Sequence, residues 1–257
     1  MSIELRNVTA GYGAQEIVFD VSATFQSSKV TAIIGPNGAG KSTLIKSLFG
    51  QARLFEGRVA LDGRELDRMS PRSLVREGVA YVPQLSNVFP RLTVRENLEI
   101  GTYVRAGGVD ERVFALFPDL HPILGRPAGK LSGGQRNMVA IGRALMSNPS
   151  VLFLDEATAG LSPALAQSVW GYLARLAGDG LAIGVVEQNV KAALDHSDHV
   201  YVLAGGRVRA HGAPASLGGD GELERLFLGS ESTVSATDDG GVARPPSYRR
   251  SEEVTNG

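Results

Sequence analysis

The residues best equipped for chemistry form one short run, Gly35-Pro36-Asn37-Gly38-Ala39-Gly40-Lys41-Ser42-Thr43. A glycine, four further residues and then Gly-Lys-Ser is the pattern of a loop that binds nucleotide phosphates, because glycines let backbone N–H groups turn inward around an anion. Lys41 would reach the β- and γ-phosphates, and the Ser42 hydroxyl would ligate Mg²⁺. The alternative is a glycine-rich turn that matches the pattern by chance.

The elements on either side of this run decide between the two interpretations. Residues 30–34 are apolar and β-branched, which predicts a buried parallel strand, and the apolar residues of 44–49 recur at helical spacing before Gly50, which would end the helix. Strand, loop and helix in this order are what a phosphate loop needs, since the helix N-terminus adds positive potential. The context therefore favours a nucleotide site.

Two later strands end in polar side chains that suit the same site. Strand 79–82 is followed by Gln84, and strand 151–154 is followed by Asp155 and Glu156. Gln84 is either a solvated loop residue or an amide that touches Mg²⁺ or the attacking water. Ligands of open α/β sheets bind beyond the carboxyl ends of the strands, which favours the second role. There Asp155 would hold Mg²⁺, and Glu156 would orient or deprotonate the water.

The rest of the chain is organised around these strands. Residues 3–25 alternate in polarity around a Gly-Tyr-Gly turn, which predicts antiparallel strands, and Tyr12 in that turn would either stack on a base or simply pack. From Leu85 to about Lys130, short helices and turns predict an inserted helical subdomain, and Ser132 is placed to cap the next helix. A short strand is expected from Gly57 to an Asp-Gly turn at residues 62–63. A helix is expected to start at Ser162-Pro163 and to end before Gly178, and a hairpin is expected near residues 200–210.

Composition limits the possible partners. The net charge of −1 and the lack of a basic stripe argue against nucleic acid. The chain has no cysteine, which suits a reducing cytoplasm and excludes thiolate metal sites. The N-terminus lacks the apolar core of a signal peptide, and no stretch reaches about 18 apolar residues, so any membrane role is expected to be peripheral.

With these motifs in place, the chain from Ile3 to about Gly229 resembles the ATP-binding subunit of an ABC transporter. The resemblance rests on an ordered set of motifs: Tyr12, the phosphate loop, Gln84, the signature Leu131-Ser132-Gly133-Gly134-Gln135, and Asp155-Glu156. It implies an α/β fold of the phosphate-loop NTPase type, with a mainly parallel core sheet, an N-terminal antiparallel part and the inserted helical subdomain. Residues 1–229 would form this domain, with the subdomain at about 85–145, and the polar residues 230–257 would be a disordered tail.

The resemblance also implies a mechanism. Two subunits would sandwich two ATP molecules head to tail, so that Ser132, Gly133, Gly134 and Gln135 of one subunit meet the nucleotide held by the phosphate loop of the other. Mg²⁺ would be held by Ser42, Gln84 and Asp155, and Glu156 would act as the base. Where many relatives have a switch histidine, this chain has Gln188, whose amide can donate to phosphate but cannot carry charge. ATP closes such a dimer, and hydrolysis opens it.

A narrower resemblance points to importers. The runs Arg95-Glu96-Asn97-Leu98, Gly160-Leu161-Ser162-Pro163 and Val186-Glu187-Gln188-Asn189 are similar to those of bacterial subunits that import branched-chain amino acids or related small amides such as urea. It implies transmembrane permease subunits, a second ATP-binding subunit of the same or another kind, an indirectly linked periplasmic solute-binding protein and no nucleic acid. The location would be the cytoplasmic face of the bacterial inner membrane. An exporter or lipid-transport ATPase and a non-transport ATPase of the family remain the alternatives.

Overall fold

The computed structural model describes residues 1–66, 70–85, 87–103 and 111–217. The expected tail at 230–257, and the end of the domain expected at about 229, lie outside these residues. Its strands are β1 (Ser2–Tyr12), β2 (Gln15–Gln26), β3 (Lys29–Ile34), β4 (Arg53–Leu61), β5 (Arg64–Glu65), β6 (Val79–Val82), β7 (Val151–Asp155), β8 (Ala182–Glu187), β9 (His199–Ala204) and β10 (Arg207–Gly212). Its helices are α1 (Lys41–Leu48), α2 (Pro71–Arg76), α3 (Val94–Thr102), α4 (Glu111–Leu116), α5 (Gly133–Leu145), α6 (Pro163–Gly178) and α7 (Val190–His196).

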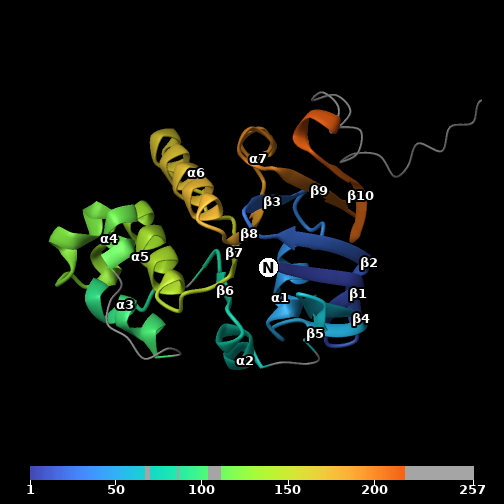
Figure 1. Cartoon of the computed structure of the whole chain (residues 1–257), viewed down its shortest axis with the longest axis horizontal. Helices are drawn as coiled ribbons and strands as arrows, with labels where there is room; N and C mark the ends of the chain where they lie inside the picture. Colours follow the sequence, from blue (N-terminus) through green and yellow to red (C-terminus); the bar gives the residue numbers. More distant parts are fainter. Residues whose placement is uncertain (67–69, 86, 104–110, 218–257) are drawn as a thin grey trace, which may run out of the picture.

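Two sheets form the β structure. The larger has the strand order β10-β9-β3-β8-β7-β6, in which only β10 pairs antiparallel, and the smaller has the antiparallel order β2-β1-β4-β5. The α/β fold with a mainly parallel core sheet and an N-terminal antiparallel part is therefore confirmed. In Figure 1, α3, α4 and α5 gather at one side of the molecule and the smaller sheet lies at the other.

Among the described residues, side chains of the core sheet enter three hydrophobic clusters, and neighbouring residues along a strand enter different ones. Leu152 and Leu154 of β7 face the core formed with α5 and α6, whereas Val151 and Phe153 face the core formed with α1 and the smaller sheet. Because the strands of a parallel sheet are covered on both faces, their sequences are apolar throughout. The buried strands predicted at 30–34, 79–82 and 151–154 are there for this reason.

Two element boundaries differ from the sequence expectations. The helix expected to end before Gly178 continues through it, and the chain turns at Gly180, whose φ of 103° only glycine adopts easily. The strand expected from Gly57 begins four residues earlier, at Arg53, because residues 53–56 pair with β1. No α-helix in the described ranges combines the length and apolarity that a membrane span requires.

Candidate functional site

The expected site residues come together at the carboxyl ends of four strands. The phosphate loop follows β3, Gln188 follows β8, Asp155 and Glu156 end β7, and Gln84 follows β6. These four strands are neighbours in the order β3-β8-β7-β6 and run parallel, so their ends meet at one edge of the sheet. The position expected for Gln84 beside the phosphate loop follows from this topology.

The phosphate loop depends on its glycines. Gly35 packs so closely that a Cβ atom there would lie 1.9 Å from the carbonyl oxygen of Leu203, and Gly40 caps α1 with a φ of 97°. Lys41 is buried, and its ammonium group donates to the carbonyl oxygens of Gly35 at 2.8 Å and Pro36 at 3.0 Å. A cleft of about 260 Å³ lies over the loop, lined by residues 37–43, Ile17 and Glu156. Loop amides, a lysine and a helix N-terminus are groups that favour an anion, and this cleft brings them together.

Charge is concentrated around Lys41. Burial lowers the pKa of its ammonium group, while the carboxylates of Glu156, Asp155 and Glu187 act in the opposite direction. The three carboxylates thus favour the charged form of the lysine, and a bound phosphate would favour it further.

Asp155 is held by two hydroxyl groups. Ser42 Oγ donates to Oδ1 at 2.9 Å and Tyr81 OH donates to Oδ2 at 3.2 Å. Burial raises the pKa of the Asp155 carboxyl, and both hydrogen bonds partly offset this by stabilising the anion. Two adjacent protein oxygens fit Mg²⁺, which takes its remaining ligands from phosphates and water. Within the described part of the chain, no three or more His, Cys, Asp or Glu side chains form a cluster that could hold a metal ion.

Glu156 lies between two amides. Gln84 Nε2 donates to one carboxylate oxygen, Oε2, and Gln188 Nε2 donates to the other, Oε1. The backbone of Glu156 has a φ of 52°, a conformation that is uncommon for residues other than glycine and that turns the chain directly after β7. Three side chains from three strand ends are thus in contact, and one of them, Glu156, lines the cleft at the phosphate loop.

The signature segment lies on a different surface. Ser132 caps α5 by accepting from the Gln135 N–H, and Gln135 Oε1 accepts from the Ser132 N–H in return. Ser132 and Gly133 are exposed, whereas Gly134 packs against Leu165, where an added Cβ would come within 1.9 Å of a side-chain carbon. Among the described residues, no hydrogen bond or ion pair joins this segment to the phosphate loop. Its cap is complete, and its exposed end is available to a second molecule.

Tyr12 ends β1, and 43% of its surface is exposed. A role in base stacking therefore stays a prediction.

Three side chains near the site were not singled out by the sequence. Tyr81 reaches Asp155, Asn137 of α5 donates to the carbonyl oxygen of Ala157, and Glu187 is only 2% exposed. Glu187 Oε1 accepts from the N–H of Thr158 at 3.2 Å and from its hydroxyl at 2.7 Å, and burial raises the pKa of its carboxyl. Of these three residues, only Glu187 carried a signal in the sequence, because it is a carboxylate at the end of an apolar strand.

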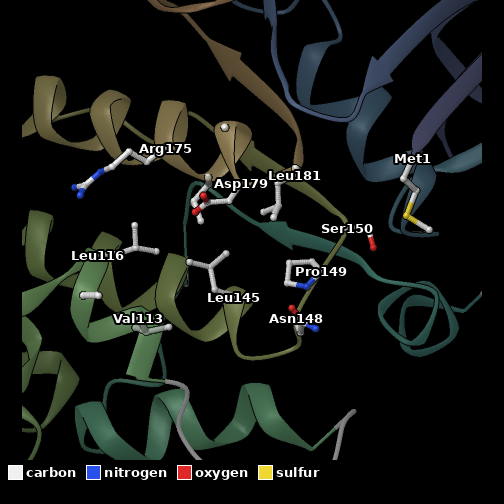
Figure 2. A pocket seen from close by; sticks show the side chains of 14 residues that line it. Met1, Val113, Leu116, Leu145, Asn148, Pro149, Ser150, Arg175, Asp179 and Leu181 are labelled. Carbon is white, nitrogen blue, oxygen red and sulfur yellow. The ribbon is translucent and has the colours of Figure 1, made fainter.

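A larger cavity lies elsewhere. This cavity has a volume of about 740 Å³, and Figure 2 shows Leu116 of α4, Leu145 of α5 and Leu181 among the side chains that line it. It lies beside residues 148–150 and 178–181, which precede β7 and β8, and so at the opposite end of the strands from the phosphate loop. Cavity size is therefore a poor guide to the nucleotide site in this protein.

The fold and the site together define a nucleotide hydrolase of the phosphate-loop class. Residues 18–159 match the family model described as ABC transporter, and the chain belongs to this family, whose ATPase domains bind and hydrolyse ATP. This confirms the family resemblance. Transporters of this family pair two such cassettes with transmembrane permease components, and the ATPase subunits associate peripherally with the membrane.

Three known proteins illustrate the similarity. The probable branched-chain amino acid transport ATP-binding protein LivF of Archaeoglobus fulgidus is 44% identical over 86% of this chain and 96% of its own length. The lipopolysaccharide export system ATP-binding protein LptB of Haemophilus influenzae is 30% identical over 88% and 96%. The crystal structure of the ADP conformation of MJ1267, an ATP-binding cassette of an ABC transporter, superposes with a TM-score of 0.78 at 30% identity, over 89% of this chain and 99% of that one.

Proposed function

We propose that this chain is the ATP-hydrolysing subunit of an ABC importer for branched-chain amino acids or related small amides. The observation that carries the proposal is the 44% identity, across nearly the whole of both chains, to a protein named as a branched-chain amino acid transport ATP-binding protein. The lipopolysaccharide-export relative, at 30% identity over a similar share, supports an exporter or lipid transporter as the second candidate.

The proposed chemistry assigns a role to each side chain of the site. Lys41 and the loop amides bind the phosphates of ATP, and Tyr12 stacks on the base. Ser42, Asp155 and Gln84 would hold Mg²⁺, and the metal would supply positive charge to the phosphates. Glu156 accepts a proton from the attacking water, while the amides of Gln84 and Gln188 orient that water and the γ-phosphate. Each amide donates to a different oxygen of Glu156, and since a carboxylate oxygen can accept a second hydrogen bond, the attacking water can still donate to Glu156.

The dimer supplies the remaining contacts. The exposed N-terminus of α5, with Ser132 and Gly134, would meet the γ-phosphate held by the partner, because its N–H groups and helix dipole favour an anion. ATP thereby links the two subunits, and its hydrolysis removes the link. Since the cap of α5 is already complete within one chain, this surface can form without the partner.

The permease is proposed to dock beside Gln84. Leu85 and Phe89 follow this glutamine and are 76% and 46% exposed, so both offer apolar surface to a permease. A permease helix covering them would sense the position of Gln84 directly. A periplasmic solute-binding protein would then act through the permeases, and the subunit would work at the cytoplasmic face of the inner membrane.

The assignment of Glu156 is tested by Glu156→Gln. This variant keeps the size of the side chain and removes the base, so it should bind ATP as the wild type does and hydrolyse it about 10²–10⁴-fold more slowly. Hydrolysis is followed by phosphate release, and binding by calorimetry. Turnover near the wild-type rate would remove Glu156 from the role of base.

The transport role is tested by purifying the tagged chain with its native membrane partners. Importer-type permeases and a second ATP-binding subunit should co-purify, and the double variant Leu85→Asp with Phe89→Asp should lose the permeases while still binding ATP. Lipid-export components in their place would establish the second candidate. Recovery of ribosomes or repair proteins alone would mean that the ATPase serves a different process.

A further inference from the structure

One amide connects the two segments that follow Gln84 and Glu156. Asn137, on the first half of α5, donates from Nδ2 to the carbonyl oxygen of Ala157 at 2.6 Å and accepts at Oδ1 from Asn87 Nδ2 at 2.8 Å. The orientation of the amide is fixed, because a carbonyl oxygen can only accept and the nitrogen of Asn137 must therefore face Ala157. Its oxygen is then free for Asn87.

A second link joins the same two segments, since Gln84 donates to the carboxylate of Glu156. Asn87 lies three residues after Gln84, and Ala157 directly follows Glu156. The two links therefore close a ring, with the proposed catalytic contact on one side and Asn137 on the other. In such a ring, loss of one hydrogen bond lets the groups that form the other move relative to each other.

Each segment is also tied to its own part of the fold. The carbonyl oxygen of Asn87 accepts from Arg143 at 3.0 Å, so the segment after Gln84 is attached to α5 at two points. On the other side, Thr158 is bound to the buried carboxylate of Glu187 at the end of β8. The backbone after Glu156 is thus held between the core sheet and the helix that starts at the signature segment.

We infer that Asn137 is a positioning residue for ATP hydrolysis, which keeps Glu156 and Gln84 in register by holding their following segments to α5. It borders no part of the cleft at the phosphate loop, so it acts through the two segments and not on the nucleotide. The inference rests on the proposed role of Glu156 as the base. It places a connection between the catalytic carboxylate and the signature helix within a single subunit.

The test uses the purified full chain and three substitutions at position 137. Asn137→Ala should lower kcat about tenfold, counted per ATP-binding site, while the Kd and KM for ATP stay within about twofold. Asn137→Asp should be at least as slow although it has the same shape, because a carboxylate cannot donate to the carbonyl oxygen of Ala157. Asn137→Gln, which keeps both a donor and an acceptor, should stay within about threefold of the wild type. Gln167→Ala, which removes an exposed amide from α6, is the control and should match the wild type.

Amide hydrogen exchange provides a readout that needs no turnover. Asn137→Ala should speed exchange both at residues 87–93 and at residues 156–160, which lie far apart in the sequence. If Asn137→Ala does not fold, Asn87→Ala breaks the same ring from the other side and should lower kcat per site similarly. An unchanged kcat per site, a loss of ATP affinity in proportion to kcat, or faster exchange confined to α5 would each overturn the inference.

The variant Glu156→Gln distinguishes failure of the inference about Asn137 from failure of the proposed role of Glu156 as the base. If Glu156→Gln loses hydrolysis while Asn137→Ala does not, only the role of Asn137 is refuted. If Glu156→Gln retains hydrolysis, the proposed base is wrong, and the inference about Asn137 is overturned with it.

Discussion

The hydroxyl group of Tyr81 offers a sharp test of how Asp155, the proposed magnesium ligand, is held. Tyr81 donates to Asp155 Oδ2 at 3.2 Å, and its ring stacks on Phe49 with a centroid distance of 5.0 Å and an interplanar angle of 22°. Tyr81→Phe removes the hydroxyl and keeps the ring. The substitution therefore isolates one hydrogen bond and leaves the packing of β6 in place.

The expected magnitude follows from the geometry. Hydrogen bonds to charged groups contribute about 1.5–3 kcal/mol. At 3.2 Å this one is longer than usual for a hydroxyl donor, so we take the lower end, about 1.5 kcal/mol. Ser42 continues to hold the other oxygen, at 2.9 Å. If the hydroxyl keeps the carboxylate ionised and aimed at the metal, the Mg²⁺ concentration for half-maximal hydrolysis should rise about tenfold, since 1.4 kcal/mol corresponds to a factor of ten.

The assay titrates Mg²⁺ at saturating ATP and follows phosphate release, with Mn²⁺ binding to the ATP complex measured in parallel by electron paramagnetic resonance. The thermal midpoint should change little, because the aromatic stack remains. A half-saturating Mg²⁺ concentration that is unchanged or lower would refute the reasoning. It would mean that Tyr81 competes with the metal for Asp155 and does not prepare the carboxylate for it.

Two further predictions concern stability. Burial raises the pKa of Glu187 in the folded state above its unfolded value, so its contribution to stability is complete below pH about 4.5 and is lost as the pH rises through the folded pKa. In calorimetry, the stability of Glu187→Gln relative to the wild type should therefore be greater at pH 8 than at pH 4.5. A stability difference that is the same at both pH values would contradict this. Gly35→Ala should lower stability by about 2–3 kcal/mol, or roughly 5–10 °C in thermal midpoint, because the added Cβ meets the Leu203 carbonyl. Gly38 also has a positive φ but open space around it, so Gly38→Ala is the matched control and should lose about 1 kcal/mol. Equal losses in the two variants would exclude the contact with Leu203 as the cause.

Much of the site was predictable because its determinants are local in the sequence. Glycines with positive φ, a lysine and a hydroxyl within nine residues define the phosphate loop wherever a strand and a helix flank it. The caps of α3 and α5 are equally local, since Thr93 with Glu96 and Ser132 with Gln135 close capping boxes three residues apart. A physical cause that acts over a few residues leaves a readable pattern.

Element boundaries were less predictable where pairing or packing decided them. Residues 53–56 join β4 because β1 offers partners, and nothing in their own sequence required this. The short helix α7, capped by Asn189, was not foreseen because seven residues carry little periodicity. Likewise, α6 runs through Gly178 because Leu176 and Ala177 are buried against the core, which outweighs the low helix propensity of glycine.

The sequence by itself determined the class of site, the order of its parts and the polar residues at the strand ends. Only the tertiary structure decided which side chains meet. Tyr81 is 74 residues from Asp155, and Asn137 is 50 residues from Asn87 and 20 from Ala157. Such contacts depend on strand order and on how α5 packs against the sheet. Hydrogen bonds between distant segments follow no fixed separation in the sequence, so no motif reveals them. The residues that hold the proposed catalytic groups in place could therefore be identified only from the fold.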